Sequence, residues 1–283
     1  MPNVALLSRI IVCASTAEAP VGLLRFAPAQ PKLPWAVDQR LNAHEYGHQC
    51  LQGSPLSGDE DCLLLNVWRA AGTTSSSSPV PVMLWIHGGS FNGGTGGSSE
   101  GLANPFDGRH LVARGVIVIA INYRLGAMGF LPVHEGVGGG SGRLNGVNDM
   151  IAALQWVQDN VRSFGGDPNQ ITVFGESAGS IAICMLSVSP RASGLFHRAV
   201  MESGTCLGSS SHDPADDKDN AHAAAELRGM NTSAVMALSY GPGVDGWVLP
   251  RPATELLQES GGVNINVDSF LMGANSFDGL YPW

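Results

Sequence analysis

The segment ITVFGESAGSIAICMLS, residues 171–187, joins an apolar strand pattern to an apolar helix pattern through a turn of small residues. The β-branched run before Gly175 is typical of a buried strand, and the run after Ser177 is long enough for a helix that ends before Pro190. A strand that leads straight into a helix is the repeating unit of a parallel sheet covered by helices. This junction therefore predicts an α/β fold.

Other segments repeat the two patterns. Apolar, β-branched runs predict further strands at 63–68, 80–86, 116–123, 199–203 and 267–273. Between two strands, apolar side chains recur at helical spacing over 147–164, and residues 165–168 end that pattern. Glycine- and serine-rich stretches predict loops, of which 208–219 is the most linker-like. We expect one domain with a mostly parallel central sheet flanked by helices.

Composition narrows the possible partners. The 283 residues carry a formal net charge of −9, with 44% hydrophobic and 14% charged residues, so the chain is globular and nucleic acid is not an expected partner. No apolar run approaches the roughly 20 residues that span a bilayer. The first residues have an apolar middle, as in a signal peptide, but Arg9 interrupts it. The five cysteines form no CxxC pair and have no His-rich partners, which argues against a zinc site. We expect neither a metal nor a cofactor.

Ser177 is the first candidate for chemistry. In a Gly-X-Ser-X-Gly turn between a strand and a helix, Gly175 and Gly179 allow a tight turn that exposes the hydroxyl. The N-terminus of the following helix would favour a negative oxygen beside it. An ordinary Gly-Ser turn has the same letters, but the strand and helix on either side favour a nucleophilic serine.

The sequence FGGDPNQITVFGESAGS around Ser177 resembles the nucleophile signature of the type-B carboxylesterases, a family that includes cholinesterases and fungal lipases. EDCLLLNVW at 60–68 is similar to the family's second signature, with Leu64 and Ala70 as departures. The blocks EAPVGLLRF, WIHGGSF, NYRLGAMGF and LFHRAVMESG follow in the family's order. The resemblance therefore implies the α/β-hydrolase fold.

Most of the chain carries this resemblance. Residues 17–283 are expected to form a partial type-B carboxylesterase domain, after an atypical N-terminal segment at 1–16. Family members begin with extra strands and continue further, so the resemblance implies a domain cut at both ends. Its sheet would be incomplete at the C-terminal side.

The loop HGGSF after the strand at 80–86 resembles the family's oxyanion loop, which usually reads GGG. An acyl-transfer enzyme needs preorganised N–H donors around the carbonyl oxygen as it becomes negative, and a glycine-rich loop lets the backbone approach it. The resemblance implies that the backbone amides of Gly89, Ser90 and Ala178 are the donors, while Gly88 shapes the turn. Ser90 stands where the family has glycine, which a backbone donor tolerates.

In this fold the acid and the histidine follow the serine in chain order. MGANSFDGL at 272–280 resembles the loop of the acid and implies that Asp278 is the acid, where the family usually has Glu; a plain turn aspartate is the alternative. The general base should come later still. All eight histidines precede Asp278, and His87 on the oxyanion loop is interpreted as structural. The chain as printed is therefore expected to be inactive.

The resemblance implies hydrolysis of a small-molecule carboxylic ester through an acyl-enzyme on Ser177. The hormone-sensitive-lipase-like group is the alternative among enzymes, and FGGDP and EDCLLLN argue against it. The alternative outside enzymes is a cholinesterase-like adhesion or binding protein, or an inactive fragment, that keeps the fold without the triad histidine. The physiological ester and the oligomeric state stay open.

The cysteines bear on the cellular compartment. Cys50 and Cys62 resemble the ends of the family's first bridged loop, which implies a disulfide between them; two free thiols are the alternative in a reducing compartment. Cys184 is expected to be buried and free, and Cys206 has no evident partner. The family implies a secreted or secretory-pathway protein, although the chain has no clear signal peptide. Glycosylation of Asn231 in the sequence NTS would support that location.

Overall fold

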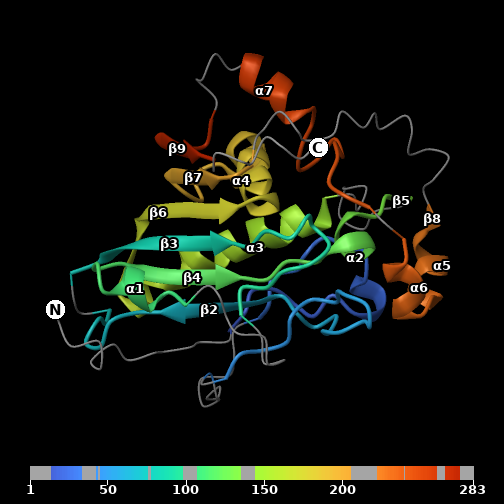
Figure 1. The fold of residues 1–283 in the computed structure, drawn as a ribbon, viewed down its shortest axis with the longest axis horizontal. Helices are drawn as coiled ribbons and strands as arrows, with labels where there is room; N and C mark the ends of the chain where they lie inside the picture. Colours follow the sequence, from blue (N-terminus) through green and yellow to red (C-terminus); the bar gives the residue numbers. More distant parts are fainter. Residues whose placement is uncertain are drawn as a thin grey trace.

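A mixed sheet forms the centre of the protein. The computed structural model describes residues 14–33, 43, 45–75, 78–97, 107–134, 144–204, 222–238, 240–259 and 265–274. In these residues the main sheet has seven strands in the order β1-β2-β4-β3-β6-β7-β9 (Figure 1). The strands are β1 (Ala14–Ser15), β2 (Leu64–Trp68), β3 (Val80–Ile86), β4 (Ile117–Ile121), β6 (Gly166–Glu176), β7 (Arg198–Glu202) and β9 (Ser269–Gly273). A separate two-stranded sheet pairs β5 (Val133–His134) with β8 (His222–Ala223).

Most of the sheet is parallel, as the sequence predicts. The neighbours β4, β3, β6, β7 and β9 pair in parallel, whereas β1 and β2 join the edge as antiparallel strands. In Figure 1 the arrowheads of β3, β4 and β6 point the same way and that of β2 points the other way. The carboxyl ends of the parallel strands therefore meet at one edge of the sheet, where ligand sites of such folds are built.

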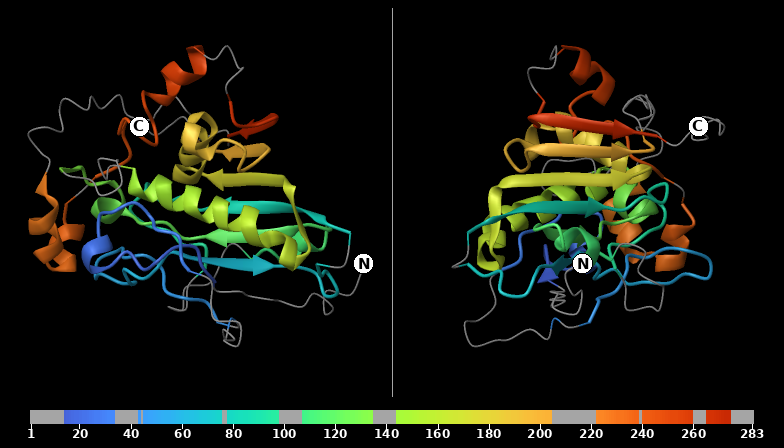
Figure 2. Two further views of the ribbon diagram at one scale, coloured as in Figure 1. Left: turned by 180° about the vertical axis from the view of Figure 1, so that it is seen from behind. Right: turned by 60° about the vertical axis from the view of Figure 1, so that its left-hand side comes forward.

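Helices cover the sheet. Figure 2 shows the two longest, α3 (Asn145–Asn160) and α4 (Ala178–Val188), on the same face. The remaining helices and 3-10 turns are η2 (Gly22–Leu24), α1 (Arg109–Val112), α2 (Gly126–Phe130), η3 (Val161–Phe164), η4 (Pro190–Ala192), α5 (Ala224–Gly229), α6 (Thr232–Met236) and α7 (Ala253–Glu259). Among these described helices, none has the length and apolar character needed to cross a membrane.

The alternation along β4 shows that both faces of the sheet are buried. Ile117, Ile119 and Ile121 belong to the main core with side chains of α3 and α4. Val118 and Ala120 point the other way, into a smaller cluster with Trp68, Trp85 and Val112 of α1. A strand buried on both faces must be apolar at every position, which explains the continuous apolar run of β4.

Strand β6 begins earlier than its composition predicts. We expect a strand from Ile171, but pairing with β3 extends it back to Gly166, which lies opposite Val80. The Val80 amide donates to the Gly165 carbonyl at 3.0 Å, and the register shifts between Val80 and Val82. Asp167 and its neighbours are poor strand formers, so tertiary pairing overrides local preference here.

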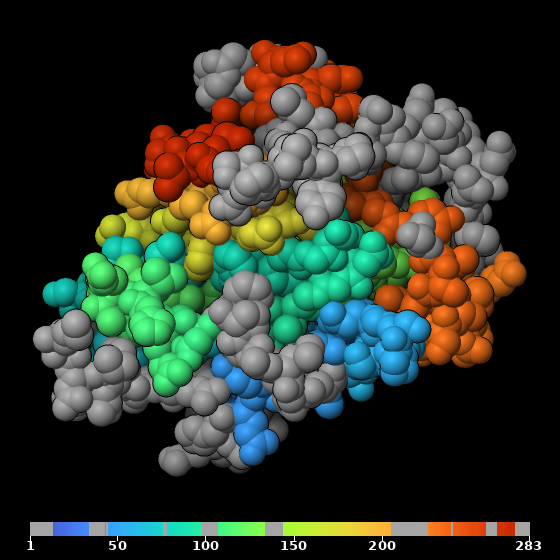
Figure 3. All heavy atoms as spheres, in the orientation of Figure 1, coloured from blue at the N-terminus to red at the C-terminus, as the bar shows by residue number. Residues whose placement is uncertain are grey.

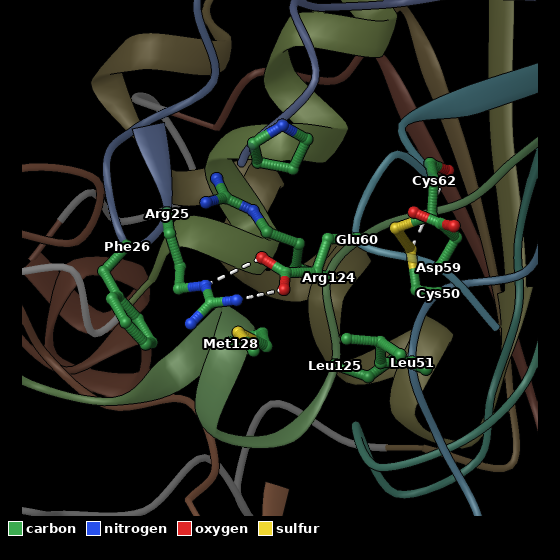
Figure 4. Close-up of a pocket in the computed structure, with 11 residues that line it drawn as sticks. Arg25, Phe26, Cys50, Leu51, Asp59, Glu60, Cys62, Arg124, Leu125 and Met128 are labelled. Carbon is green, nitrogen blue, oxygen red and sulfur yellow. Dashed lines mark hydrogen bonds and ion pairs between the residues drawn. A yellow bond between two sulfur atoms is a disulfide. The ribbon is translucent and has the colours of Figure 1, made fainter. Parts of the chain in front are cut away.

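Residues 25–27, which precede β2, are held against the rest of the fold by hydrogen bonds and an ion pair. The Arg124 guanidinium donates to the Ala27 carbonyl at 2.8 Å, and the Asn145 side chain donates to the Phe26 carbonyl at 2.8 Å. Figure 4 shows Arg25 facing Glu60, with which it forms a two-pronged ion pair. Residues that precede the first long strand are therefore part of the folded domain.

The structure confirms one cysteine prediction and corrects another. Cys50 and Cys62 form a disulfide, with 4.9 Å between their Cα atoms. Cys184 is buried, as expected, but it is disulfide-bonded, so the prediction of a free thiol is wrong. The apolar pattern of α4 indicates burial and contains no information on whether the thiol is bonded. Cys206 and the linker-like stretch 208–219 lie outside the described residues.

Candidate active site

Ser177 lies at the carboxyl edge of the sheet, between the last residue of β6 and the first of α4. Its backbone has φ 54° and ψ −118°, a combination that side-chain-bearing residues rarely adopt. The turn is held in this geometry because the Ser177 amide donates to the Glu202 carbonyl at 2.9 Å and the Ser177 carbonyl accepts from the Ile181 amide at 3.0 Å. The Ser177 side chain is partly exposed. The hydroxyl is thus presented from a strained, anchored turn.

The glycines on either side of Ser177 are required by close backbone contacts. A Cβ atom at Gly179 would lie 2.1 Å from the Ile86 carbonyl oxygen, and one at Gly175 would lie 2.6 Å from the same oxygen. These are contacts with backbone, which cannot move aside as a flexible side chain can. Gly175 and Gly179 therefore allow the tight turn that the sequence pattern predicts, and they let α4 begin directly against the end of β3.

The loop after β3 lies directly against the Ser177 turn. A Cβ atom at Gly88 would lie 2.7 Å from the Glu176 carbonyl oxygen and 3.2 Å from the Ser177 Cβ atom. Gly89 has φ +109°, and its carbonyl accepts from the amides of Asn92 and Gly93, both at 3.0 Å. The structure thus brings together Ser177 and the glycine loop that the sequence singles out.

The backbone of Ser90 is strained, although the sequence predicts that serine is tolerated at this position as a backbone donor. Ser90 has φ 55° and Phe91 has φ 58°, both in the left-handed region that glycine adopts freely. The buried ring of Phe91 packs edge-on against Phe130 with 5.2 Å between centroids, which anchors the loop. Gly89 and Ser90 are exposed, so the outer side of the loop is open to solvent.

Ala178 is the first residue of α4. The N–H groups of a helix's first turn have no acceptor within the helix, and they lie at its positive end. The Ser177 amide is already used by Glu202, so the amide of Ala178 is the first one at this helix end without an acceptor in the part of the chain that the structure describes. This is the position that an oxyanion donor needs.

Sequence reasoning missed the support that β7 gives to this turn. From sequence alone, the segment LFHRAVMESG is only evidence of the family resemblance, yet its last residues form hydrogen bonds that support the Ser177 turn. Besides the Glu202 carbonyl that receives the Ser177 amide, the Gly204 carbonyl accepts from the Ser180 hydroxyl at 3.1 Å. The parallel pairing of β6 with β7, which sets Glu176 opposite Glu202, is the signal that could have found these contacts.

Asp278 lies outside the described residues. His197 precedes β7, and its ring accepts from the Ile171 amide at 3.3 Å. Ser177 lies six steps along the chain from Ile171, roughly 20 Å at 3.3 Å per step, whereas a base must come within about 3 Å of the hydroxyl. His110 lies on α1, which precedes β4 and so belongs to the same remote edge.

His87 is next to the loop but is enclosed. Its ring is 1% exposed and stacks on Tyr123, with 4.3 Å between centroids. Nδ1 lies 2.9 Å from the Gly88 carbonyl oxygen, which can only accept, so Nδ1 carries the proton and Nε2 is the unprotonated nitrogen. Nε2 is buried and has no hydrogen-bond partner among the described residues. Burial lowers the pKa of His87 to about 4, so the ring is neutral and structural at neutral pH.

The titration of His87 gives a prediction for stability. Between pH 6.5 and about 4 the unfolded chain binds a proton that the folded chain does not, so stability is complete above pH 6.5 and is lost as pH falls. This difference in pKa between the folded and unfolded chains corresponds to about 3 kcal/mol of the free energy of unfolding. Urea unfolding at pH 7 and pH 4 should therefore show that the free energy of unfolding decreases less in His87→Asn than in the parent protein. The asparagine amide can replace the Nδ1 donor. Equal losses in both proteins would contradict this assignment.

Comparisons with known proteins agree with this geometry. The model of the Carboxylesterase family matches residues 16–238. Carboxylesterase 1D of Rattus norvegicus is 42% identical over 241 residues, which cover 78% of this chain and 40% of that protein. Carboxylesterase 1C of Rattus norvegicus is 35% identical over 304 aligned residues, covering 92% of this chain and 51% of that protein. The chain thus spans about half the length of the curated relatives it matches, or less.

Solved structures show the same fold. PNB esterase superposes with a TM-score of 0.79 at 33% identity, covering 96% of this chain and 61% of that one. Carboxylesterase EST55 of Geobacillus stearothermophilus, at pH 6.2, gives a TM-score of 0.77 at 32% identity, covering 94% of this chain and 57% of that one. The α/β-hydrolase fold that the sequence predicts is therefore confirmed. Because the family model matches more than half of its residues, the chain belongs to the carboxylesterase family.

Proposed function

We propose that this protein is a carboxylic ester hydrolase whose nucleophile is Ser177. The observation that supports the proposal is the strained Ser177 turn lying directly against the glycine loop at Gly88. A serine in an ordinary turn has neither the positive φ nor a second backbone loop packed on it. Relatives named carboxylesterase and pyrethroid hydrolase support a small-molecule ester as the substrate.

In the proposed reaction, the Ser177 hydroxyl oxygen attacks the carbonyl carbon of the ester. The carbonyl oxygen becomes negative and receives hydrogen bonds from the backbone amides of Gly89, Ser90 and Ala178, with Gly88 forming the turn. The tetrahedral intermediate expels the alcohol and leaves an acyl group on Ser177. Water then releases the carboxylic acid. In the complete triad a histidine carries the proton in both steps, and we assign Asp278 as the acid that orients it.

Backbone donors fixed in these positions would favour attack on an acyl carbonyl, because they are in place before the charge develops. A bound ester needs no charge until attack begins, and the charge then appears where the amides already point. Removing one such donor from a related type of site costs roughly 10²- to 10³-fold in rate. No metal or cofactor is needed for these steps, because the serine supplies the nucleophile and the backbone stabilises the oxyanion.

Covalent labelling tests the identity of the nucleophile. We expect a fluorophosphonate to form an adduct on the peptide that contains Ser177, and Ser177→Ala to abolish it. The adduct is irreversible, so even slow attack accumulates product that mass spectrometry can locate. Ser193→Ala is the matched control, because Ser193 is an exposed serine in an ordinary turn and its loss should leave labelling unchanged. Labelling that persists in Ser177→Ala would overturn the proposal.

The disulfides support the secretory-pathway location that the family resemblance implies. The Cys50–Cys62 bridge and the bonded Cys184 form and persist in an oxidising compartment. We therefore include secretion in the proposal.

A further inference from the structure

The sequence Asn231-Thr232-Ser233 has no part in the proposed reaction. It is the only place in the 283 residues where Asn is followed by a residue other than Pro and then by Ser or Thr. Such a sequence is the acceptor for N-linked oligosaccharides in secreted proteins. From its setting in the fold, we propose that Asn231 is a site of N-linked glycosylation.

The conformation of Asn231 leaves the reactive atom available. Asn231 has an extended backbone, φ −68° and ψ 153°, and directly precedes α6. Its Oδ1 accepts from the Ala234 amide at 2.8 Å. A backbone N–H can only donate, so the oxygen faces the helix and the Nδ2 amide nitrogen lies on the other side of the side-chain amide. Attachment of a sugar to Nδ2 keeps Oδ1 as an acceptor, so the modified residue can still cap α6.

The burial pattern of α6 shows that the glycosylation sequence lies on its solvent-exposed side. Val235 is buried in a cluster with Met128 and Leu227, so the inner side of α6 faces the domain. Asn231 and Ser233 are exposed. Figure 3 shows α5 and α6 in orange at the rim of the molecule, with a broad outer surface. An oligosaccharide on Asn231 would therefore extend into solvent without displacing the core.

The residues that precede Asn231 are held in place by hydrogen bonds with Arg25. The Arg25 guanidinium donates to the Met230 carbonyl at 2.9 Å while its other side binds Glu60 (Figure 4). The Arg228 side chain donates back to the Arg25 carbonyl at 3.2 Å. None of these contacts uses the side chain of Asn231, which is exposed. Modification of Asn231 leaves all of them unchanged.

The chemistry is a single group transfer. The Asn231 Nδ2 attacks C1 of an oligosaccharide carried on a lipid diphosphate, and the new bond joins Nδ2 to C1. The bond between C1 and the diphosphate oxygen breaks, the lipid diphosphate leaves with the electron pair, and Nδ2 loses one proton to a base of the transferase. Nothing is oxidised or reduced. The donor belongs to the same oxidising compartment that the disulfides indicate.

Expression of the 283-residue chain behind a cleavable secretion leader in human cells tests this site. We expect peptide N-glycosidase F to shift the protein by the mass of one glycan and to convert Asn231 to Asp, which mass spectrometry locates. Ser233→Ala should abolish the shift while leaving Asn231 and its cap in place. Thr232→Ala is the matched control, because it changes the middle residue and keeps the acceptor sequence.

A variant that fails to fold does not blur the result, because the transfer takes place during translocation. Cell-free translation with rough microsomes gives the same readout on the protease-protected chain, whether or not the chain is later secreted. Asn231→Asp provides a carboxylate oxygen that can cap α6 in place of the amide oxygen, and it should also lose the shift. Unmodified Asn231 in the protected pool, or a shift that survives Ser233→Ala, would overturn the proposal.

Discussion

Replacing Asp149 with alanine is expected to lower the free energy of unfolding by about 3 to 5 kcal/mol. Asp149 on α3 and Arg124 after β4 form an ion pair in which the side chains are 0% and 3% exposed. Asp149 Oδ2 accepts from the Arg124 backbone amide at 3.0 Å and from Nε at 2.8 Å, and Oδ1 accepts from Nη2 at 2.6 Å. Its removal leaves a buried guanidinium without its counter-ion, which costs far more than the pair itself contributes.

The loss of stability should extend beyond the ion pair, because the same guanidinium also donates to the Ala27 carbonyl and so holds the chain that precedes β2. A domain with 5 to 15 kcal/mol of total stability would have little left. Urea unfolding of Asp149→Ala measures the effect. Asp107→Ala is the matched control, because Asp107 pairs with Arg109 on the surface, and we expect its unfolding midpoint to stay near that of the parent. Equal unfolding midpoints for the two variants would contradict the prediction, because the buried pair with Arg124 would then matter no more for stability than the surface pair with Arg109.

Local sequence patterns predict the centre of the fold well. β3, α4 and the Ser177 turn lie where apolar runs and glycines place them, because each is set by residues that are adjacent in sequence. The same reasoning finds α3, although it predicts one continuous helix to Phe164 where the α-helix ends at Asn160 and a 3-10 turn follows. It does not find the early start of β6 at Gly166, which depends on pairing with Val80, far away in sequence.

The site shows the same division between local and distant information. The Gly88 loop and the Ser177 turn can each be recognised alone, but their contact results from the parallel pairing of β3 with β6. The Glu202 carbonyl that holds the Ser177 amide and the bonded state of Cys184 depend on chain segments that no local pattern links to them. Sequence patterns therefore indicate which residues could react, and topology determines which atoms hold them in place.

The second large effect concerns turnover, which we expect to be absent from the 283-residue chain even if Ser177 is labelled. Catalysis needs a base within about 3 Å of the hydroxyl, and all eight histidines precede Asp278. His197 lies at the remote edge of the sheet and His87 is buried and neutral. Loss of one triad member leaves roughly 10³- to 10⁴-fold over the reaction in water, from oxyanion stabilisation and binding alone.

Steady-state assays with p-nitrophenyl acetate and p-nitrophenyl butyrate on monomeric protein measure this. We expect the parent and Ser177→Ala to give the same rate in plain buffer, because serine attack without a base is too slow to sustain turnover. Free imidazole should restore a difference between the two proteins, with Ser177→Ala subtracting the reaction of imidazole itself with the ester. Turnover in plain buffer that disappears in Ser177→Ala would contradict the prediction and would assign the base to a histidine of this chain. His48→Gln would then test an exposed candidate on the loop before Cys50, with His197→Gln as the matched control at the remote edge.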